Sequence, residues 1–428
     1  MDVMFGLAIG IFASVFVLMI SGKVHRTAAV IAGAVLMVGV GILNEHDVIR
    51  VIEWEALGLI FGMFVLVAAL TESGFFRWLG LHALKITKFN PLKIFILFSA
   101  LSAILAAFMD SITVLIFMAS LLIEVCAILK MPVLPFLLGA ITSANIGGSA
   151  TMVGDPPNIV IGTALDYTFM DFVTHTGPIA VVVFFVNLAF FYLWYKKIFN
   201  EPEVDLEEIY HEHKDLEPYS AVKDHHLMTV ALVAFAFTVT MLVLHHSLGL
   251  VVAFVGIMGA TLVMLFGGER MPEVVERIDW HTILFLAGLF VMVGGLEEAG
   301  VLDSIANGII SVGAGSLVLT LTLILWVSAF SSALLDNVPF AAAMVNVVRN
   351  VSENTSIGVD PMAYTLALGA DVGGNATPIG ASANVVGLAV AQKHGIKTTW
   401  KQYCKVAVPA MIVSMLVINV LVLLMFAL

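Results

Sequence analysis

The chain repeats itself at a constant offset of 226 residues, and this internal repeat limits its possible folds more than any other feature. Trp54 is matched by Trp280 and Asp110 by Asp336, and the correspondence runs without a gap from about residue 54 to residue 160. Between residues 145 and 160, seven of sixteen positions are identical to their partners in the second copy. The fold must therefore contain two copies of one structural unit.

The composition places both copies in a membrane. Hydrophobic residues make up 61% of the chain and charged residues 12%, whereas an ordinary soluble domain has roughly 25% charged residues. Such a chain has too little polar surface for a soluble enzyme, and its net charge of −12 offers no basic surface for nucleic acid. Two cysteines, Cys126 and Cys404, cannot form a thiolate metal cluster. We therefore expect no enzyme, no nucleic-acid partner and no metal centre.

Apolar stretches long enough to cross a bilayer, about 20 residues, recur along the chain. Two others are broken near their middles by Gly, Pro, Asn and Asp, at 133–168 and 361–393, and two are too long for one span, at 91–130 and 316–350. The uninterrupted spans are 4–20, 27–43, 56–72, 176–195, 227–246, 249–266, 281–297 and 405–427.

Each overlong stretch has an acidic residue near its centre, Asp110 or Asp336. It can be two full spans joined by an external turn, or a re-entrant hairpin whose tip stops inside the membrane. We favour the hairpin, because its tip could meet a broken helix at one site. Each copy then has five spans, and an odd number makes the second copy enter from the opposite side. The predicted fold is an all-α polytopic membrane protein with two inverted five-span repeats, each with a re-entrant helical hairpin and a broken transmembrane helix.

The distribution of Lys and Arg predicts the orientation, since these residues collect on the cytoplasmic side. With the N-terminus outside, seventeen of the nineteen lie inside, and Arg50 and Arg349 lie outside. We expect a multi-pass protein of the cell's inner (plasma) membrane with both termini outside. Residues 1–195 are the expected N-terminal repeat, 196–226 a cytoplasmic acidic linker, and 227–428 the C-terminal repeat.

The two broken spans carry most of the candidate site for a substrate or ion. Gly and Pro release backbone carbonyls and amides from the helix, and Asn, Ser and Thr add oxygen ligands that suit Na⁺ or a hydroxyl-bearing substrate. A structural kink could explain one such break, but two at matched positions favour a binding site. The candidates are Asn145, Gly147, Gly148, Ser149, Thr151, Asp155, Asn158, Asp371, Gly373, Gly374, Asn375, Thr377, Ser382 and Asn384.

The hairpin tips supply the remaining candidates. An ionisable group at membrane depth is costly and usually functional, although an aqueous turn would also accommodate it. The candidates here are Asp110, Ser111, Thr113, Asp336 and Asn337.

Four Asp residues, two from each copy, therefore approach one region. The span assignment puts no Lys or Arg beside Asp110, Asp155, Asp336 and Asp371. Like charges in a low-dielectric cavity cannot all be ionised, so we expect them to share protons and to couple transport to protons.

Two sequence strings resemble a known family. Residues 145–158, NIGGSATMVGDPPN, and residues 109–113, MDSIT, resemble motifs of the arsenite permease and sodium/proton antiporter branch (ArsB/NhaD-type, P-protein-like) of the ion transporter superfamily. Divalent-anion/sodium symporters are similar at the broken helices but have Ser-Asn-Thr at the hairpin tips. The resemblance covers nearly the whole chain and implies a homodimer with a transport domain that moves against a scaffold, as in an elevator.

The sequence thus predicts a secondary active transporter for a small inorganic solute or ion. Arsenite or antimonite efflux ranks first, because the trivalent acid is neutral and needs no fixed cation. Sodium/proton antiport follows narrowly, and dicarboxylate uptake is third. No cofactor is expected beyond H⁺ or Na⁺ as the coupling ion, and an arsenite pump would need a separate ATPase subunit. A channel or an intramembrane aspartyl protease is a weaker alternative, and the protease motif Gly-x-Gly-Asp is missing at 152–155 and 368–371.

Overall fold

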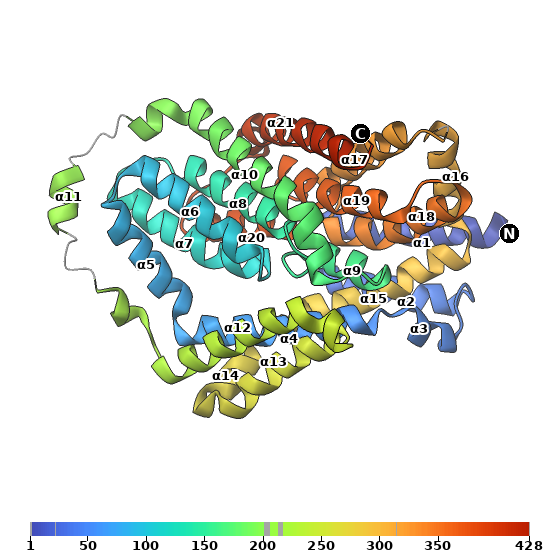
Figure 1. Cartoon of the computed structure of the whole chain (residues 1–428), viewed down its shortest axis with the longest axis horizontal. Coiled ribbons are helices and arrows are strands. Elements are labelled where there is room, and N and C mark those ends of the chain that lie inside the picture. The colour runs from blue at the N-terminus through green and yellow to red at the C-terminus, as the bar shows by residue number, and fades with distance from the viewer. Residues whose placement is uncertain (1, 22, 201–205, 213–216, 314, 428) are drawn as a thin grey trace.

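The computed structural model describes residues 2–21, 23–200, 206–212, 217–313 and 315–427. Every regular element in these residues is a helix (Figure 1). Parts of the expected linker, 201–205 and 213–216, lie outside the described residues. Its described parts contain the end of one long helix, the short helix α11 (Leu206–Glu212) and the 3₁₀ helix η1 (Pro218–Ala221).

The described residues of the first repeat form ten helices. Its membrane helices and short connecting helices follow one another as α1 (Asp2–Ser21), α2 (Arg26–Gly39), α3 (Glu45–Val51), α4 (Trp54–Ser73), α5 (Phe75–Thr87), α6 (Pro91–Ala106), α7 (Ser111–Ile128), α8 (Leu134–Gly148), α9 (Pro156–Ala164) and α10 (Phe169–Asn200).

The second repeat has the same ten in the same order, with two added 3₁₀ turns. They are α12 (His225–Leu248), α13 (Val252–Phe266), η2 (Gly268–Arg270), α14 (Met271–Glu276), α15 (Trp280–Glu298), α16 (Val301–Gly313), α17 (Leu317–Leu334), α18 (Asn337–Asn354), α19 (Val359–Gly373), η3 (Gly374–Ala376), α20 (Ser382–Lys393) and α21 (Trp400–Phe426).

The two repeats are inverted, as the matched helices α4 and α15 demonstrate. Glu72 near the end of α4 accepts a hydrogen bond from Nε of Arg277, just before α15, at 2.6 Å. At the opposite end, the side chain of Val51, just before α4, packs on Gly294 near the end of α15. The two helices therefore run antiparallel, which confirms the inversion predicted from the odd number of spans.

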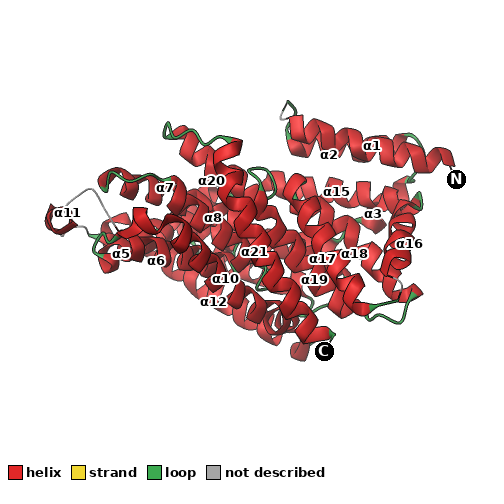
Figure 2. Ribbon diagram, turned by 90° about the horizontal axis from the view of Figure 1, so that it is seen from above, coloured by secondary structure: helices red, strands yellow, loops and turns green. Residues whose placement is uncertain are grey.

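One set of helices, here called the scaffold group, consists of α1–α4 and α12–α15. In this group α4 packs on α13, and α2 packs on α15. Figure 2 shows α1 and α2 beside α15 at one edge of the molecule. A side chain at Gly62 would collide with the backbone of Gly256, so α4 and α13 approach as closely as two backbones can.

The other set, here called the core group, consists of the hairpins α6–α7 and α17–α18 and the broken helices α8–α9 and α19–α20. Gly147 of α8 packs on the backbone of Ala103 in α6, and Gly373 of α19 packs on the backbone of Ala329 in α17. The second half of each broken helix packs on the hairpin of the other repeat, α20 on α7 and α9 on α18. The core group is therefore one interlocked unit built from both repeats.

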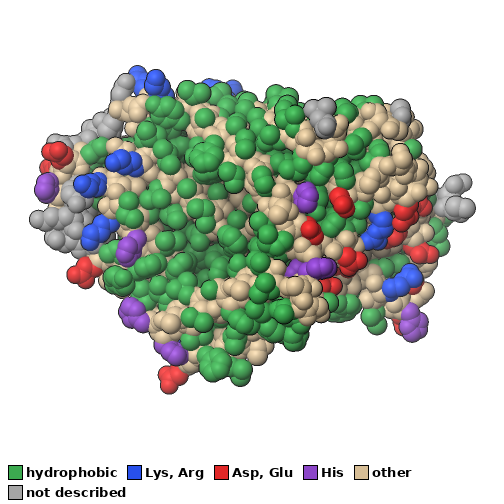
Figure 3. Space-filling model, in the orientation of Figure 1, with side chains coloured by type: hydrophobic (Ala, Val, Ile, Leu, Met, Phe, Trp, Pro, Cys, Tyr) green, Lys and Arg blue, Asp and Glu red, His purple; other side chains and the backbone are tan. Residues whose placement is uncertain are grey.

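The surface matches a membrane protein. Hydrophobic side chains cover the middle of the face in Figure 3, and charged side chains gather toward its two ends. Within the described residues, α4, α7, α10, α12, α15, α17 and α21 have the length and apolar composition to cross a membrane. The shorter apolar helices include α6 and α8, in the core group.

Candidate functional site

Each hairpin tip is an Asp that caps the helix following it. Oδ2 of Asp110 accepts from the backbone N–H of Thr113 (3.1 Å) and from its hydroxyl (3.3 Å), while Oδ1 of Asp336 accepts from the backbone N–H of Val338 (3.2 Å). Asp is a preferred N-cap because its carboxylate satisfies amides that have no partner within the helix. Both aspartates lie on the helix-initiating turn of a hairpin inside the protein, as the hairpin interpretation requires.

Each broken helix is closed across its gap by one Asn. The Asn158 amide donates to the carbonyls of Gly148 (3.0 Å) and Thr151 (3.1 Å), and the equivalent Asn384 donates to Gly374 and Thr377, both at 2.8 Å. Buried backbone carbonyls need such partners, because none are available from lipid. These two Asn side chains therefore replace the missing turn of helix.

The threonines of the breaks fasten the broken helices to the hairpins. The Thr151 hydroxyl donates to the carbonyl of Ala107, and the Thr377 hydroxyl donates to Ala333. Ala107 and Ala333 are themselves equivalent positions, close to the ends of α6 and α17. The hydroxyls of Thr151 and Thr377 thus hold the backbone in place.

Four helix N-termini converge on one small cavity, those of α7, α9, α18 and α20. Its lining includes Asp110, Ser111, Asp155, Asn337 and Ser382. Measured for the centre of a water molecule, its volume is about 20 Å³, and one water needs about 10–15 Å³ by that measure. The positive ends of the helix dipoles favour the carboxylates gathered there. In this conformation the cavity has room for an ion or a water molecule.

Asn337 joins two buried carboxylates from opposite repeats. Its Nδ2 lies 3.3 Å from Oδ2 of Asp155 and 3.5 Å from Oδ1 of Asp371. Asp155, Asp371 and Asn337 are at most 5% exposed. Asp155 sits at the N-cap position of α9, but its side chain makes no capping hydrogen bond to that helix. Its carboxylate instead accepts from Asn337. We refer to this arrangement as the Asp155–Asn337–Asp371 junction.

Three buried oxygens of the broken helices have no donor, and one of them belongs to this junction. Among the described residues, Oδ2 of Asp371 and Oδ1 of both Asn145 and Asn158 have no hydrogen-bond partner. The amide nitrogen of Asn145 is fully used, donating to Oδ1 of Asn375 (2.8 Å) and of Asn384 (2.9 Å). Buried acceptors are costly unless something donates to them, and a proton or a small cation would satisfy them.

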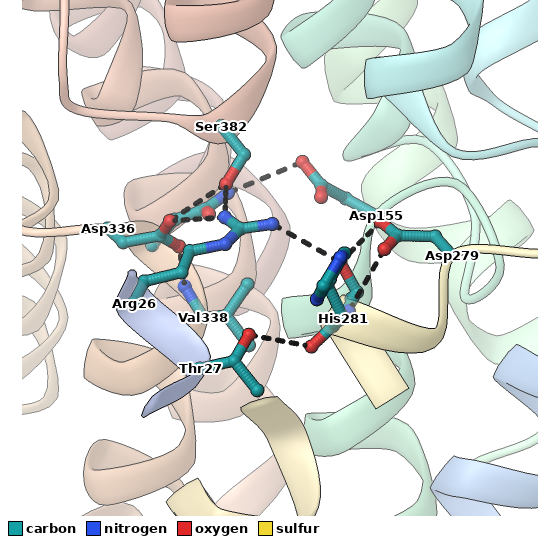
Figure 4. Close-up of polar contacts among 10 residues, drawn as sticks. Arg26, Thr27, Asp155, Asp279, His281, Asp336, Val338 and Ser382 are labelled. Atoms are coloured by element: carbon teal, nitrogen blue, oxygen red, sulfur yellow. Dashed lines mark hydrogen bonds and ion pairs between the residues drawn. The ribbon is translucent and has the colours of Figure 1, made fainter. Parts of the chain in front are cut away.

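Arg26 corrects the expectation that no Lys or Arg lies beside the four aspartates. It is the first residue of α2, and its Nη1 lies 2.6 Å from Oγ of Ser382 and 3.5 Å from Oδ2 of Asp336. Its Nη2 donates to the hydroxyl of Thr282 at 3.2 Å, and its guanidinium lies over the ring of Phe285. Figure 4 shows Arg26 beside Ser382 and Asp336. The side chain is long enough to reach inward from the end of a span.

The predicted residues thus divide into two kinds. Asp110, Ser111, Asp155, Asn337 and Ser382 line the cavity, and Asp336 and Asp371 join it through Arg26 and Asn337. The others hold the backbone of the hairpins and broken helices in place, an arrangement that we call the frame. Thr113 donates to the capping carboxylate of Asp110, Ser149 donates to the carbonyl of Ile146, and Asn375 accepts from Asn145. The frame also includes Gly147, Gly148, Gly373 and Gly374, which permit close backbone contacts.

Sequence reasoning missed Arg26, Thr282 and Phe285, which also line the cavity. The repeat gives no signal for them, because the equivalent positions are Val252, Ala56 and Leu59. Lys23 lies in the loop just before α2 and is exposed, so charge alone does not distinguish it from Arg26.

Comparison with known proteins gives consistent similarities. Residues 16–369 match a family described as "Citrate transporter". An uncharacterized transporter of Mycobacterium tuberculosis is 32% identical over 404 residues, covering 93% of each chain. The human P protein is 27% identical, and the match covers 95% of this chain and 58% of the P protein. The YdaH transporter of Alcanivorax borkumensis shares the fold, with a TM-score of 0.56, 13% identity, and coverage of 89% of this chain and 88% of that one.

Proposed function

Because the chain belongs to the citrate transporter family, we propose that it is a secondary active transporter whose coupling cation binds at the Asp155–Asn337–Asp371 junction. Sodium/proton exchange is the activity that the site supports best. The observation that carries this proposal is the pair of buried carboxylates from opposite repeats that share one amide group. Two carboxylates this close in a low-dielectric interior need a proton or a cation to offset their repulsion.

The chemistry of the surrounding groups fits either H⁺ or Na⁺. A proton would give one carboxyl group a hydrogen to donate, and the unpartnered oxygens of Asn145, Asn158 and Asp371 are the hard ligands that Na⁺ prefers. The cavity volume of about 20 Å³ also suits a single small ion. Asp155 and Asp371 would carry the ion, and Asn337 would position the two carboxylates.

A carboxylate solute is the second candidate, and Arg26 is the observation that favours it. A guanidinium binds carboxylates through two parallel hydrogen bonds, and here it is joined by the hydroxyls of Thr282 and Ser382. The name of the family points the same way. In such a symporter, the junction would bind the coupling ion while Arg26 binds the solute.

Arsenite or antimonite efflux, ranked first from the sequence, now comes third. The hydroxyls of Ser111, Thr282 and Ser382 offer oxygen contacts to a neutral trihydroxy acid. The cysteines offer none, since Cys126 is buried in α7 and Cys404 lies on α21, and neither lines the cavity. A neutral acid could donate its hydroxyl hydrogens to the carboxylates, but it would bring no positive charge to offset their repulsion, so the carboxylates fit an ion better.

Flux into proteoliposomes separates these activities. Na⁺, citrate and arsenite are each offered with and without a pH gradient. We expect Na⁺ flux driven by the gradient, and its loss in Asp155→Asn and Asp371→Asn. The matched control is Asp360→Asn, on the same helix as Asp371 but bonded to Tyr167 at 2.7 Å. Full gradient-driven flux in both junction variants would refute the proposed site, and citrate flux without Na⁺ flux would establish the second candidate.

A further inference from the structure

The strongest unexplained feature is that Arg26 joins the scaffold group to the core group. The guanidinium belongs to α2 of the scaffold group, and one of its partners, Thr282, belongs to α15 of that same group. Its other partners, Asp336 and Ser382, belong to hairpin and broken helix of the core group. The Ser382 hydroxyl also donates to Oδ2 of Asp336 at 2.8 Å, so the contact on the core side is itself a bonded pair.

The equivalent positions of the other repeat lack the residues needed for such a contact. The position equivalent to Arg26 is Val252, and the equivalents of Thr282 and Ser382 are Ala56 and Pro156. Only the aspartate is kept, as Asp110 and Asp336. The opposite end of the scaffold group therefore has an apolar side chain at the position equivalent to Arg26, although the two ends are built from equivalent helices.

The cavities between the two groups are also unequal. The cavity lined by Phe290, Val293 and Ala342 has a volume of about 430 Å³. Its equivalent, lined by Phe64, Val67 and Ile116, has about 250 Å³. Inverted-repeat transporters alternate by moving one bundle against the other around the site. Because equivalent spaces differ in size, the structure represents one of two such arrangements.

We propose that Arg26 is a latch that stabilises this arrangement, in which the hairpin tip of the second repeat lies against the start of α2. Sliding the core group away would withdraw Asp336 and Ser382 and leave the guanidinium with Thr282 and Phe285. A partly buried cation that loses a carboxylate and a hydroxyl is destabilised. The alternative arrangement gains no replacement, because Val252 stands at the equivalent position. This inference concerns Asp336 and holds whichever ion the junction carries.

A distance measurement between the two groups tests the latch. Spin labels are placed at Leu284→Cys on α15 and Val385→Cys on α20, two positions that are half exposed, with Cys126→Ala and Cys404→Ser removing the native thiols. Pulsed electron paramagnetic resonance of the full chain in liposomes then reports the population of each arrangement. We expect one dominant distance in this background.

The key variant is Arg26→Gln, and its matched control is Lys23→Gln, at an exposed position of the loop that precedes α2. Loss of one charge-assisted hydrogen bond corresponds to roughly a tenfold change in an equilibrium. We therefore expect Arg26→Gln to raise the ratio of the second distance to the first about tenfold, and Lys23→Gln to leave the distribution as it was.

Asp336→Asn weakens the same contact by changing its partner in the core group. This variant tests the latch even if Arg26→Gln does not fold. It should shift the distribution in the same direction, and the double variant should add little to either single change. Arg26→Lys keeps the positive charge but loses the planar pair of guanidinium donors. Its distance ratio should therefore lie between those of the unmutated background and Arg26→Gln. Identical distributions for folded Arg26→Gln and Lys23→Gln, or an unchanged distribution in Asp336→Asn, would overturn the latch. The readout involves no substrate, so the latch and the proposed cation exchange fail independently.

Discussion

The two hairpin tips have the same aspartate but different surroundings. Asp110 bonds the backbone and hydroxyl of Thr113 on its own helix, whereas Asp336 also binds Ser382 and Arg26 from other elements. Next to them, Ser111 in one tip corresponds to Asn337 in the other, and only Asn337 reaches the two buried carboxylates. The duplication thus preserved the capping geometry, while the charged and bridging groups diverged.

The same division extends through the broken helices. The frame is shared: Asn158 and Asn384 close their gaps with the same pair of bonds. The acids are not equivalent, since Asp155 corresponds to Ala381 and Asp371 to Asn145. A symmetric frame allows the hairpins to enter from both sides, and asymmetric side chains give the single junction its charge. The predictions below test this division between frame and chemistry.

The largest effect is expected where both repeats need a glycine. A β-carbon at Gly147 would meet the backbone of Ala103 at 2.1 Å, and one at Gly373 would meet Ala329 at 2.3 Å. Gly147→Ala and Gly373→Ala should each cost about 3 kcal/mol or more, the upper range for overpacking, measured as thermal stability in detergent. Gly308→Ala is the control, because nothing lies within 4 Å of it. A large loss in only one repeat would contradict a shared frame.

Removing the Asn side chains that close the two helix breaks should have the next largest effect on stability. Asn158→Ala removes two hydrogen bonds and Asn384→Ala removes three, because Asn384 also accepts from Asn145. At about 1 kcal/mol per bond, the losses in unfolding free energy should be about 2 and 3 kcal/mol. Asn354→Ala, which removes one exposed bond, serves as the control. A larger loss of unfolding free energy in Asn158→Ala than in Asn384→Ala would contradict this prediction.

Exchanging the tips tests the asymmetric chemistry directly. Asn337→Ser gives the second tip the residue of the first and removes the amide between Asp155 and Asp371. Hydrogen bonds to charged groups contribute roughly 1.5–3 kcal/mol, so the cation concentration for half-maximal flux should change about tenfold or more. Flux titrations in proteoliposomes measure this, with Asn354→Ser on the same helix as control. If the cation concentration for half-maximal flux is unchanged in Asn337→Ser, Asn337 does not contribute to ion binding.

The smallest effect is expected at the two matched tryptophans. Nε1 of Trp54 donates to the carbonyl of Ile49 at 3.0 Å, and Nε1 of Trp280 donates to the carbonyl of Val275 at 3.3 Å. Trp54→Phe and Trp280→Phe should each lower stability by about 1 kcal/mol or less, because these bonds are exposed. Thermal unfolding of the two variants should agree closely. A marked difference would show that the frame also differs near its surface.

The frame could be predicted from the residues alone. Spacing, apolar length and the 226-residue offset predicted inverted repeats, hairpins and broken helices, because each follows from local composition and from the number of membrane crossings. The family relationship and the fold comparison support the same architecture. The sequence also predicted which residue types gather at the breaks, since only Gly, Pro and polar side chains interrupt an apolar helix there.

The partner of each polar side chain depends on contacts between helices that are distant in the sequence. Asn158 and Thr151 were candidate ligands, yet their hydrogen atoms go to backbone carbonyls that the break leaves open. Arg26 and Asp336 are separated by 310 positions, and no periodicity links them. Composition fixes which groups must be satisfied, whereas the identity of the partner depends on which helices lie side by side. The folded chain brings the start of α2 to the tip of the second hairpin, and that contact gives Arg26 its partner.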